Sequence, residues 1–182
     1  MQVLKTSIEG LLILEPKIFG DHRGYFLESF NDNVFSALIG TKVSFVQDNE
    51  SMSNKNVVRG LHFQYPPHAQ GKLVRVVKGS VLDVAVDLRK SSATYGQVFT
   101  IELSELNKRQ FWIPPGFAHG FATLEDNTIF QYKCTNYYSP ENEATICWND
   151  KSLAIDWIIN EPIISEKDKK GLSFDAFKTP FE

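Results

Sequence analysis

The chain has 182 residues, of which 42% are hydrophobic and 13% aromatic, and its formal net charge is -3 at pH 7. This length and apolar content predict one folded domain over residues 1–182 rather than a disordered chain. The small negative charge excludes a broad basic surface that would neutralise a nucleic-acid backbone. The apolar run near residues 11–14 is far too short to cross a membrane, so we expect a soluble, cytoplasmic protein without nucleic-acid or membrane partners.

Short strand-like segments, separated by glycine and proline turns, recur along the chain and predict an all-β sandwich or barrel. The expected strands lie at residues 11–19, 25–30, 43–49, 58–64, 72–78, 80–89, 97–103, 129–138, 144–148 and 155–159. Residues 20–24 and 51–56 are expected to be loops. Pro16 interrupts the first strand, which indicates an edge strand or exchange with a partner chain.

Two short helices are expected besides the strands. Asn31 can cap a helix that runs to residue 39 and ends at Gly40, and a second helix is expected to open at Ser165. Cys134 and Cys147 are too few for a disulfide framework and lack the spacing of a zinc site, so both are expected to be packing residues.

The stretch from Val58 to Arg89 brings an imidazole and an ammonium group into one neighbourhood. His62 lies in one strand-like segment and Lys72 begins the next, and Gly79 can adopt the positive φ of a tight hairpin turn after it. Beyond that turn, period-two alternation puts apolar residues on one face and a polar set on the other. The apolar set is Leu82, Val84, Val86 and Leu88, and the other set is Asp83, Ala85, Asp87 and Arg89.

The segment Pro114-Pro115-Gly116, with His119 three residues later, resembles the second motif of the cupin superfamily, whose jelly-roll barrel often holds a metal. Metal-binding cupins have a His-x-His pair in the first motif, whereas this chain reads His62-Phe63-Gln64. Lys72 stands near the place of the metal-binding carboxylate, and an ammonium group repels a cation. We therefore expect no metal and no other cofactor.

The remaining set of imidazole, ammonium and tyrosines suits proton abstraction beside a carbonyl. His62 can accept a proton near neutral pH and Lys72 can stabilise the enolate oxygen, while a tyrosine can return a proton to the opposite face. Taken singly, a histidine in a strand is more often an ordinary core or surface group.

Four motifs, together with the segment Phe45 to Asn49, resemble the dTDP-4-dehydrorhamnose 3,5-epimerase family in sequence and in order. They are residues 59–64 (RGLHFQ), 70–75 (QGKLVR), 112–121 (WIPPGFAHGF) and 132–138 (YKCTNYY). The resemblance implies a cupin-like jelly-roll barrel with two or so short helices, acting as a homodimer. It also implies epimerisation at the two carbons beside the 4-keto group of a dTDP-linked 6-deoxyhexose.

The resemblance further implies roles for individual residues. His62 would be the base and Tyr132 the acid, with Lys72 near the keto oxygen and Asp168 orienting the histidine. Substrate-binding positions implied by the family, or lying within its motifs, are Arg23, Phe26, Glu28, Gln47, Asp48, Asn49, Arg59, Lys72, His119, Tyr138, Glu143 and Lys167.

Several alternatives stay open from the residues alone. Ser165 to Asp168 has the spacing of a helix capping box, in which the acid would bond a free backbone N–H, and Asp83 is a second candidate to orient His62. Other readings of the function are a dTDP-sugar 5-epimerase or 3,4-ketoisomerase on the same scaffold, or a non-catalytic sugar-nucleotide binding module.

Overall fold

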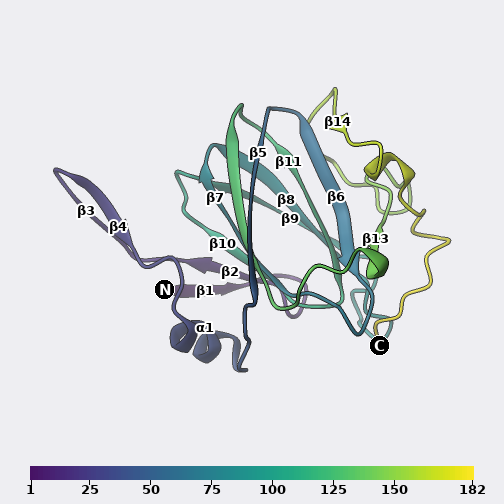
Figure 1. Cartoon of the computed structure of the whole chain (residues 1–182), viewed down its shortest axis with the longest axis horizontal. Helices are drawn as coiled ribbons and strands as arrows, with labels where there is room; N and C mark the ends of the chain where they lie inside the picture. The colour runs from purple at the N-terminus through teal and green to yellow at the C-terminus, as the bar shows by residue number, and fades with distance from the viewer.

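The computed structural model describes residues 1–182 and contains two antiparallel sheets that face each other (Figure 1). The first sheet has the order β1 (Gln2–Lys5), β2 (Leu12–Glu15), β10 (Gln110–Ile113), β7 (Lys72–Lys78), β12 (Thr128–Cys134) and β5 (Gln47–Ser53). The second has the order β13 (Glu143–Thr145), β6 (Val57–Gln64), β11 (Phe117–Thr123), β8 (Ser80–Asp87) and β9 (Val98–Ser104), and β14 (Ile163–Ile164) pairs in parallel with β6. This arrangement is a cupin-like jelly roll, so the predicted fold is confirmed.

Strand β8 shows how the sequence pattern forms the core. The predicted alternation is confirmed, because Val84 and Val86 pack on one side of the sheet and Ala85 on the other. One side faces the first sheet, and the other is covered by the returning C-terminal segment through Trp157 and Phe177. Every residue of β8 is therefore buried, and Asp83 is enclosed among apolar groups of the barrel.

The first predicted helix is confirmed as α1 (Asp32–Ile39). The Asn31 side chain accepts a hydrogen bond from the backbone N–H of Val34 at 3.2 Å, and Gly40 ends the helix with a φ of 75°. The buried Phe35 anchors this helix through a T-shaped contact with the Trp112 ring, with ring centroids 5.2 Å apart.

The predicted second helix is wrong, because the C-terminal region has only a 3-10 turn, η2 (Asp168–Lys170), besides the earlier η1 (Pro140–Asn142). Gly171 packs so tightly on Cys147 that an added Cβ would lie 2.7 Å from the backbone nitrogen of that residue. The chain leaves Gly171 in an extended form, and Leu172 then pairs with Ile146. Tertiary contact with the sheet thus ends the helical turn. The longest helix has eight residues, and no helix has the length and apolar character that crossing a bilayer requires.

The predicted hairpin at Gly79 is also wrong in its pairing. Gly79 has the expected positive φ of 77°, but β7 belongs to the first sheet and β8 to the second. The turn therefore passes the chain from one sheet to the other. Alternation in the sequence gave the direction of the side chains, whereas it contains no information on which strand becomes the neighbour.

Residues 16–27 differ most from the prediction. Pro16 lies in a connection after β2, which is an inner strand, and the expected loop and packed strand are instead a hairpin of β3 (Ile18–Asp21) and β4 (Gly24–Leu27). This hairpin projects away from both sheets (Figure 1). Tyr25 and Phe26 are 59% and 67% exposed, so they do not join the core. The side chain of Tyr25 contacts that of Lys108, and Phe26 lies beside Phe19 of the same hairpin.

Two further strand predictions are wrong, one in its bounds and one in its existence. Strand β5 covers residues 47–53 instead of 43–49, because its polar residues pair with β12 along an edge of the sheet where one face meets solvent. Residues 155–159 form no strand and pack on the second sheet through Trp157.

A matched pair of glycine substitutions tests the turn between the sheets. Gly79 and Gly40 have nearly equal positive φ values, but only at Gly79 would an added Cβ meet a neighbour, the Oγ1 atom of Thr128 at 2.4 Å. Gly40→Ala should lower the free energy of unfolding by about 1 kcal/mol through backbone strain alone. Gly79→Ala should lower it more, and urea denaturation of both variants measures the difference. Equal losses would contradict a steric requirement at this turn.

Candidate active site

A small cavity of about 90 Å³ opens at one end of the barrel and joins strands of both sheets. Strands β5, β7 and β12 supply one side of it, and β6 and β13 supply the other. Its lining residues are Gln47, Asn49, His62, Phe63, Gln64, Gln70, Lys72, Tyr132, Cys134, Tyr138 and Glu143. Three of the four predicted catalytic residues therefore lie around one space.

Asp168, the fourth predicted catalytic residue, does not line the cavity but contacts His62. Its Oδ1 atom lies 2.6 Å from Nε2 of His62, and its Oδ2 atom accepts from the backbone N–H of Gly60 at 3.3 Å. Burial raises the pKa of Asp168, but the hydrogen bonds from His62 and Gly60 outweigh it and the net pKa lies below the ordinary value. An ionised carboxylate only accepts, so Nε2 carries the hydrogen and Nδ1 keeps the lone pair that can take up a proton.

A β-bulge in β6 creates this contact. His119 pairs with His62 and Phe121 pairs with Arg59, so β6 has one residue more than β11 between the two pairs. Gly60 sits in this bulge with a φ of 125°, and its Cα is so close to β11 that a Cβ would lie 2.6 Å from the Cα of Gly120. The bulge aims the N–H of Gly60 at Asp168 and sets the direction of the following histidine.

Tyr132 and Lys72 reach the cavity from the first sheet. Burial raises the pKa of Tyr132, so its phenol keeps a proton at neutral pH. Burial lowers the pKa of Lys72, against the opposing charges of Cys134, Glu143 and Asp83. A protonated phenol and the amino group of Lys72, whose pKa burial lowers, therefore lie across the cavity from His62.

His119 and Asp83 form a second pair inside the barrel. The Nε2 atom of His119 lies 3.0 Å from both carboxylate oxygens of Asp83, and both side chains are buried. Asp168 contacts His62 and Asp83 contacts His119, so the alternative of Asp83 as the partner of His62 does not hold.

Five more of the predicted residues are joined by hydrogen bonds at the mouth of the cavity. Glu143 accepts hydrogen bonds from Tyr138 Oη at 2.7 Å and from Lys167 Nζ. Burial raises the pKa of Glu143, but these two donors outweigh it and the net pKa is lowered. Gln47 lies beside them and accepts from the backbone N–H of Tyr138 at 2.9 Å, while its own amide donates to Asn49.

Arg59 leaves β6 and bonds across to β5, where its Nε donates to Ser53 Oγ at 3.1 Å. Asp48 lies on the opposite face of β5 from Gln47 and Asn49, and it is paired with Lys133 at 2.8 Å. Neither Arg59 nor Asp48 lines the cavity. For Asp48 the reason is the period-two alternation of the strand.

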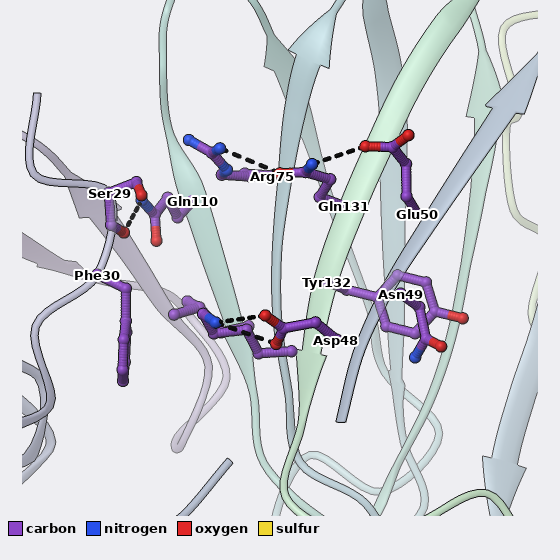
Figure 2. A pocket seen from close by; sticks show the side chains of 11 residues that line it. Ser29, Phe30, Asp48, Asn49, Glu50, Arg75, Gln110, Gln131 and Tyr132 are labelled. Carbon is purple, nitrogen blue, oxygen red and sulfur yellow. Dashed lines mark hydrogen bonds and ion pairs between the residues drawn. The ribbon is translucent and has the colours of Figure 1, made fainter. Parts of the chain in front are cut away.

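A larger hollow of about 330 Å³ lies on the outer face of the first sheet. Figure 2 shows Asp48 and Glu50 directed to this side and Asn49 and Tyr132 to the other side of β5. Gln131 there accepts from Arg75 at 3.0 Å and donates to Glu50 at 2.7 Å (Figure 2). None of His62, Lys72 and Asp168 lines this hollow, so the smaller cavity is the candidate active site.

Three predicted binding residues are not brought to the cavity at all. Arg23 lies in the turn of the projecting hairpin and pairs with Asp21, Phe26 lies on β4, and Glu28 follows it and accepts from Asn31. None of the three lines the cavity.

Four cavity residues were not predicted as site residues, namely Phe63, Gln64, Gln70 and Cys134. Gln64 is buried, and its side-chain oxygen accepts from Ser139 while its amide donates to Tyr137, which holds the loop that carries Tyr138. Its position two residues after His62 on one strand was the signal that could have revealed it. Cys134, expected only to pack, also lines the cavity, and its Sγ accepts from Asn49 at 3.6 Å.

The donor set around the cavity gives no multidentate metal site. No three His, Cys, Asp or Glu side chains of the structure gather as metal ligands would, and each carboxylate near the cavity is already bonded to a cationic or imidazole group.

A jelly roll with a His–Asp pair, a lysine and a tyrosine around one cavity defines an acid–base enzyme that acts beside a carbonyl. The model of the dTDP-4-dehydrorhamnose 3,5-epimerase family matches residues 5–176. An enzyme of that name from Salmonella typhimurium is 59% identical over 169 residues, or 92% of each chain. The chain therefore belongs to the dTDP-4-dehydrorhamnose 3,5-epimerase family, and the resemblance read from its motifs is confirmed.

Solved structures agree with this placement. A dTDP-6-deoxy-D-glucose-3,5-epimerase from Legionella pneumophila, in complex with dTDP-4-keto-L-rhamnose, has a TM-score of 0.95 and 48% identity, covering 100% of this chain and 98% of that one. A 3'-monoepimerase from Streptomyces bikiniensis, in complex with dTDP-quinovose, has a TM-score of 0.89 and 30% identity, covering 93% of this chain and 86% of that one. The same fold thus accompanies both double and single epimerisation.

Substitution can separate the two roles considered for the Ser165 to Asp168 segment, which are capping of the turn and orientation of His62. Ser165 Oγ accepts from the backbone N–H of Asp168 at 3.1 Å, as a cap would, whereas the Asp168 carboxylate is turned to His62. Asp168→Asn should lower kcat by about ten- to a hundredfold, because the imidazole loses its orienting anion. Ser165→Ala should lower the melting temperature and change kcat little.

The pH dependence of stability gives a further readout of Asp168. Its folded-state pKa is lowered, so the carboxylate contributes stability above about pH 4, and this contribution is lost as the pH falls. Asp168→Asn should remove that part of the acid dependence. Unchanged turnover in a destabilised Asp168→Asn variant would assign the residue to capping instead.

Proposed function

We propose that the chain converts dTDP-4-dehydro-6-deoxy-D-glucose into dTDP-4-dehydro-L-rhamnose, by epimerisation at C3 and C5, in dTDP-L-rhamnose biosynthesis. The observation that carries this proposal is the His62–Asp168 pair at 2.6 Å, which faces a cavity shared with Tyr132 and Lys72. A binding module would need no such proton-transfer set, and the high similarity to named 3,5-epimerases supports the same reaction.

The mechanism follows from the positions of these groups. Nδ1 of His62 removes the proton from a carbon beside the 4-keto group, and Asp168 stabilises the imidazolium that forms. The ammonium group of Lys72 stabilises the enolate oxygen. Tyr132 donates a proton from the first sheet, opposite His62 on the second sheet, which inverts the carbon.

Single epimerisation is the second candidate. The 3'-monoepimerase from Streptomyces bikiniensis shares the fold at 30% identity, so architecture alone does not separate one inversion from two. The greater identity to the 3,5-epimerases favours two inversions.

Incubation with the dTDP-4-keto sugar in deuterated water tests the proposal. NMR should show deuterium at both C3 and C5, together with the L-configured product. Deuterium at one carbon would indicate a monoepimerase, and no deuterium would indicate a binding module. His62→Ala should slow the exchange by about two to four orders of magnitude, the usual effect of losing a general base.

Tyr132→Phe provides the sharper variant in the same assay. His62 can still remove a proton and return a deuteron on its own face, so exchange should continue while little inverted product forms. Wild-type rates of inversion in Tyr132→Phe would place the acid elsewhere. Joint loss of exchange and inversion would assign Tyr132 to binding or enolate stabilisation.

We further propose that the enzyme is a homodimer whose active site is completed by the partner's hairpin. The cavity of one chain, about 90 Å³, is far below the roughly 300–1,000 Å³ of pockets that enclose a drug-sized ligand. The β3–β4 hairpin carries Arg23 and the exposed rings of Phe19 and Phe26 away from its own barrel. Such aromatic groups are typical of an interface, and a guanidinium suits a diphosphate.

Substitution of the hairpin tests the homodimer. Phe26→Asp should raise KM at least tenfold and weaken the dimer, because the exposed ring would lose its apolar contacts with the partner. Light scattering and steady-state kinetics measure both effects. Leu106→Asp is the control, because Leu106 is 87% exposed and lies outside the hairpin and the cavity. A monomeric wild-type chain with full activity would contradict the proposal.

A cytoplasmic location is also proposed. Cys134 and Cys147 are both free thiols, as is usual for proteins kept in a reducing compartment.

A further inference from the structure

Gln64 ends β6 beside the cavity, and its side-chain amide is fully engaged. The residue is only 3% exposed. Its Nε2 atom donates to the backbone carbonyls of His68 at 2.6 Å and Tyr137 at 3.1 Å, and its Oε1 atom accepts from the backbone N–H of Ser139 at 2.8 Å. Turning the amide over would set its NH₂ group against the N–H of Ser139, so these partners fix its orientation. Gln64 is therefore a buried anchor for the loops around it.

The segment that Gln64 holds has no regular structure of its own. Residues 135–139 form neither strand nor helix, so their backbone groups need partners from elsewhere. Gln64 bonds the residue on each side of Tyr138, and Gln47 accepts from the N–H of Tyr138 itself at 2.9 Å. Gln47 begins β5 in the first sheet, whereas Gln64 ends β6 in the second. Two glutamine side chains thus fasten residues 137–139 to both sheets.

The hydrogen bond between Tyr138 and Glu143 depends on Gln64 at both ends. Tyr138 Oη donates to the Glu143 carboxylate at 2.7 Å, and Lys167 donates to the same group. Gln64 holds the backbone on either side of the tyrosine, and it is also the residue of β6 that pairs with Glu143 of β13. The positions of Tyr138, Glu143 and Lys167, which we call the mouth group, therefore depend on one glutamine.

The proposed substrate must extend past the mouth group. The cavity of about 90 Å³ is too small to enclose a nucleotide sugar, so the nucleotide has to lie outside it when the sugar is inside. The Tyr138 residue is 51% exposed there, and Lys167 presents an ammonium group. An aromatic ring can stack on a base, and an ammonium group can pair with a phosphate.

We propose that Gln64 is a positioning residue that sets the affinity for the nucleotide part of the substrate, by holding residues 137–139 and the mouth group in place before the substrate binds. This inference rests on the proposed function for the identity of the nucleotide. A segment that is already ordered loses little conformational freedom on binding, so less of the binding free energy is spent on ordering it. The side chain of Gln64 bonds backbone groups of loops and not His62, so proton transfer should not depend on it.

Amide hydrogen exchange measured by NMR tests the hold on the segment without any ligand. In Gln64→Met, a neutral change of similar length, the N–H of Ser139 loses its acceptor. The N–H of Tyr138 keeps its acceptor on Gln47, but it should also exchange about tenfold faster, because the segment is no longer fastened to the second sheet. An unchanged rate at Tyr138 would overturn the inference, since Gln64 would then hold one N–H and not the segment.

Steady-state kinetics and calorimetric titration with dTDP test the effect on affinity. Gln64→Met should raise KM for the dTDP-4-keto sugar and the Kd of dTDP about tenfold, while kcat stays within about twofold of the wild type. A lower melting temperature with unchanged KM and Kd would assign Gln64 to the fold alone. A fall in kcat at unchanged KM would assign it to the reacting centre. Either result would overturn the inference.

Thr123→Val is the matched control, because it is also neutral and conserves size. Thr123 is buried at the opposite end of β6 from Gln64, and its Oγ1 atom lies 2.6 Å from the carbonyl of Asn54 and 2.9 Å from that of Val57. Thr123→Val should lower the melting temperature and leave KM and Kd unchanged. An equal rise in both constants would show a general effect of destabilisation and overturn the inference.

A second variant and the wild type complete the test. If Gln64→Met does not fold, Gln64→Glu keeps an acceptor for Ser139 but loses both donors, and the same changes in KM and Kd are expected. A wild type that binds dTDP but incorporates no deuterium would contradict the proposed reaction, and the dTDP affinity of the variants would still test Gln64. A wild type that does not bind dTDP would overturn the inference itself.

Discussion

The hydrogen bond between His62 and Asp168 joins residues 106 positions apart, and the arrangement of the active site depends on it. Asp168 reaches β6 only because the C-terminal segment returns across the second sheet and buries Trp157 and Phe177 there. The bulge at Gly60 then presents an N–H to the second carboxylate oxygen. The orientation of the proposed base thus depends on three features together. They are the packing of the apolar C-terminal segment, the bulge at Gly60 and the hydrogen bond from His62 to Asp168.

The charges inside the barrel follow a consistent distribution. Each carboxylate near the cavity has a cationic or imidazole partner, whereas Lys72 is left free of a direct ion pair and can face an enolate oxygen. In a tight salt bridge the charge of a lysine would already be compensated, and its N–H donors occupied, before the substrate arrived.

The hairpin of β3 and β4 explains why a tight core and an incomplete cavity occur in one chain. The two sheets bury their own apolar faces, so the core does not need the hairpin. Its aromatic side chains remain exposed. Arg23 lies in the turn that joins β3 and β4, and this hairpin projects away from both sheets (Figure 1). A second copy of the chain that covered these rings would explain why apolar groups are exposed on the hairpin. The same copy would enlarge the cavity, which is too small by itself for a nucleotide sugar.

The sequence by itself determined the all-β class, the capped helix after Asn31 and the two faces of β8, and it indicated an imidazole at His62 and an ammonium group at Lys72 as a pair for acid–base chemistry. These properties depend on local periodicity, capping and side-chain type, which each segment carries within itself. Only the tertiary structure decided that β7 and β8 belong to different sheets, that residues 18–27 project as a hairpin and that the turn at Asp168 stays short. It also decided that Asp168 contacts His62 while Asp83 contacts His119. Strand neighbours and partners of buried charges are set by contacts between residues far apart in the chain, which no local pattern encodes.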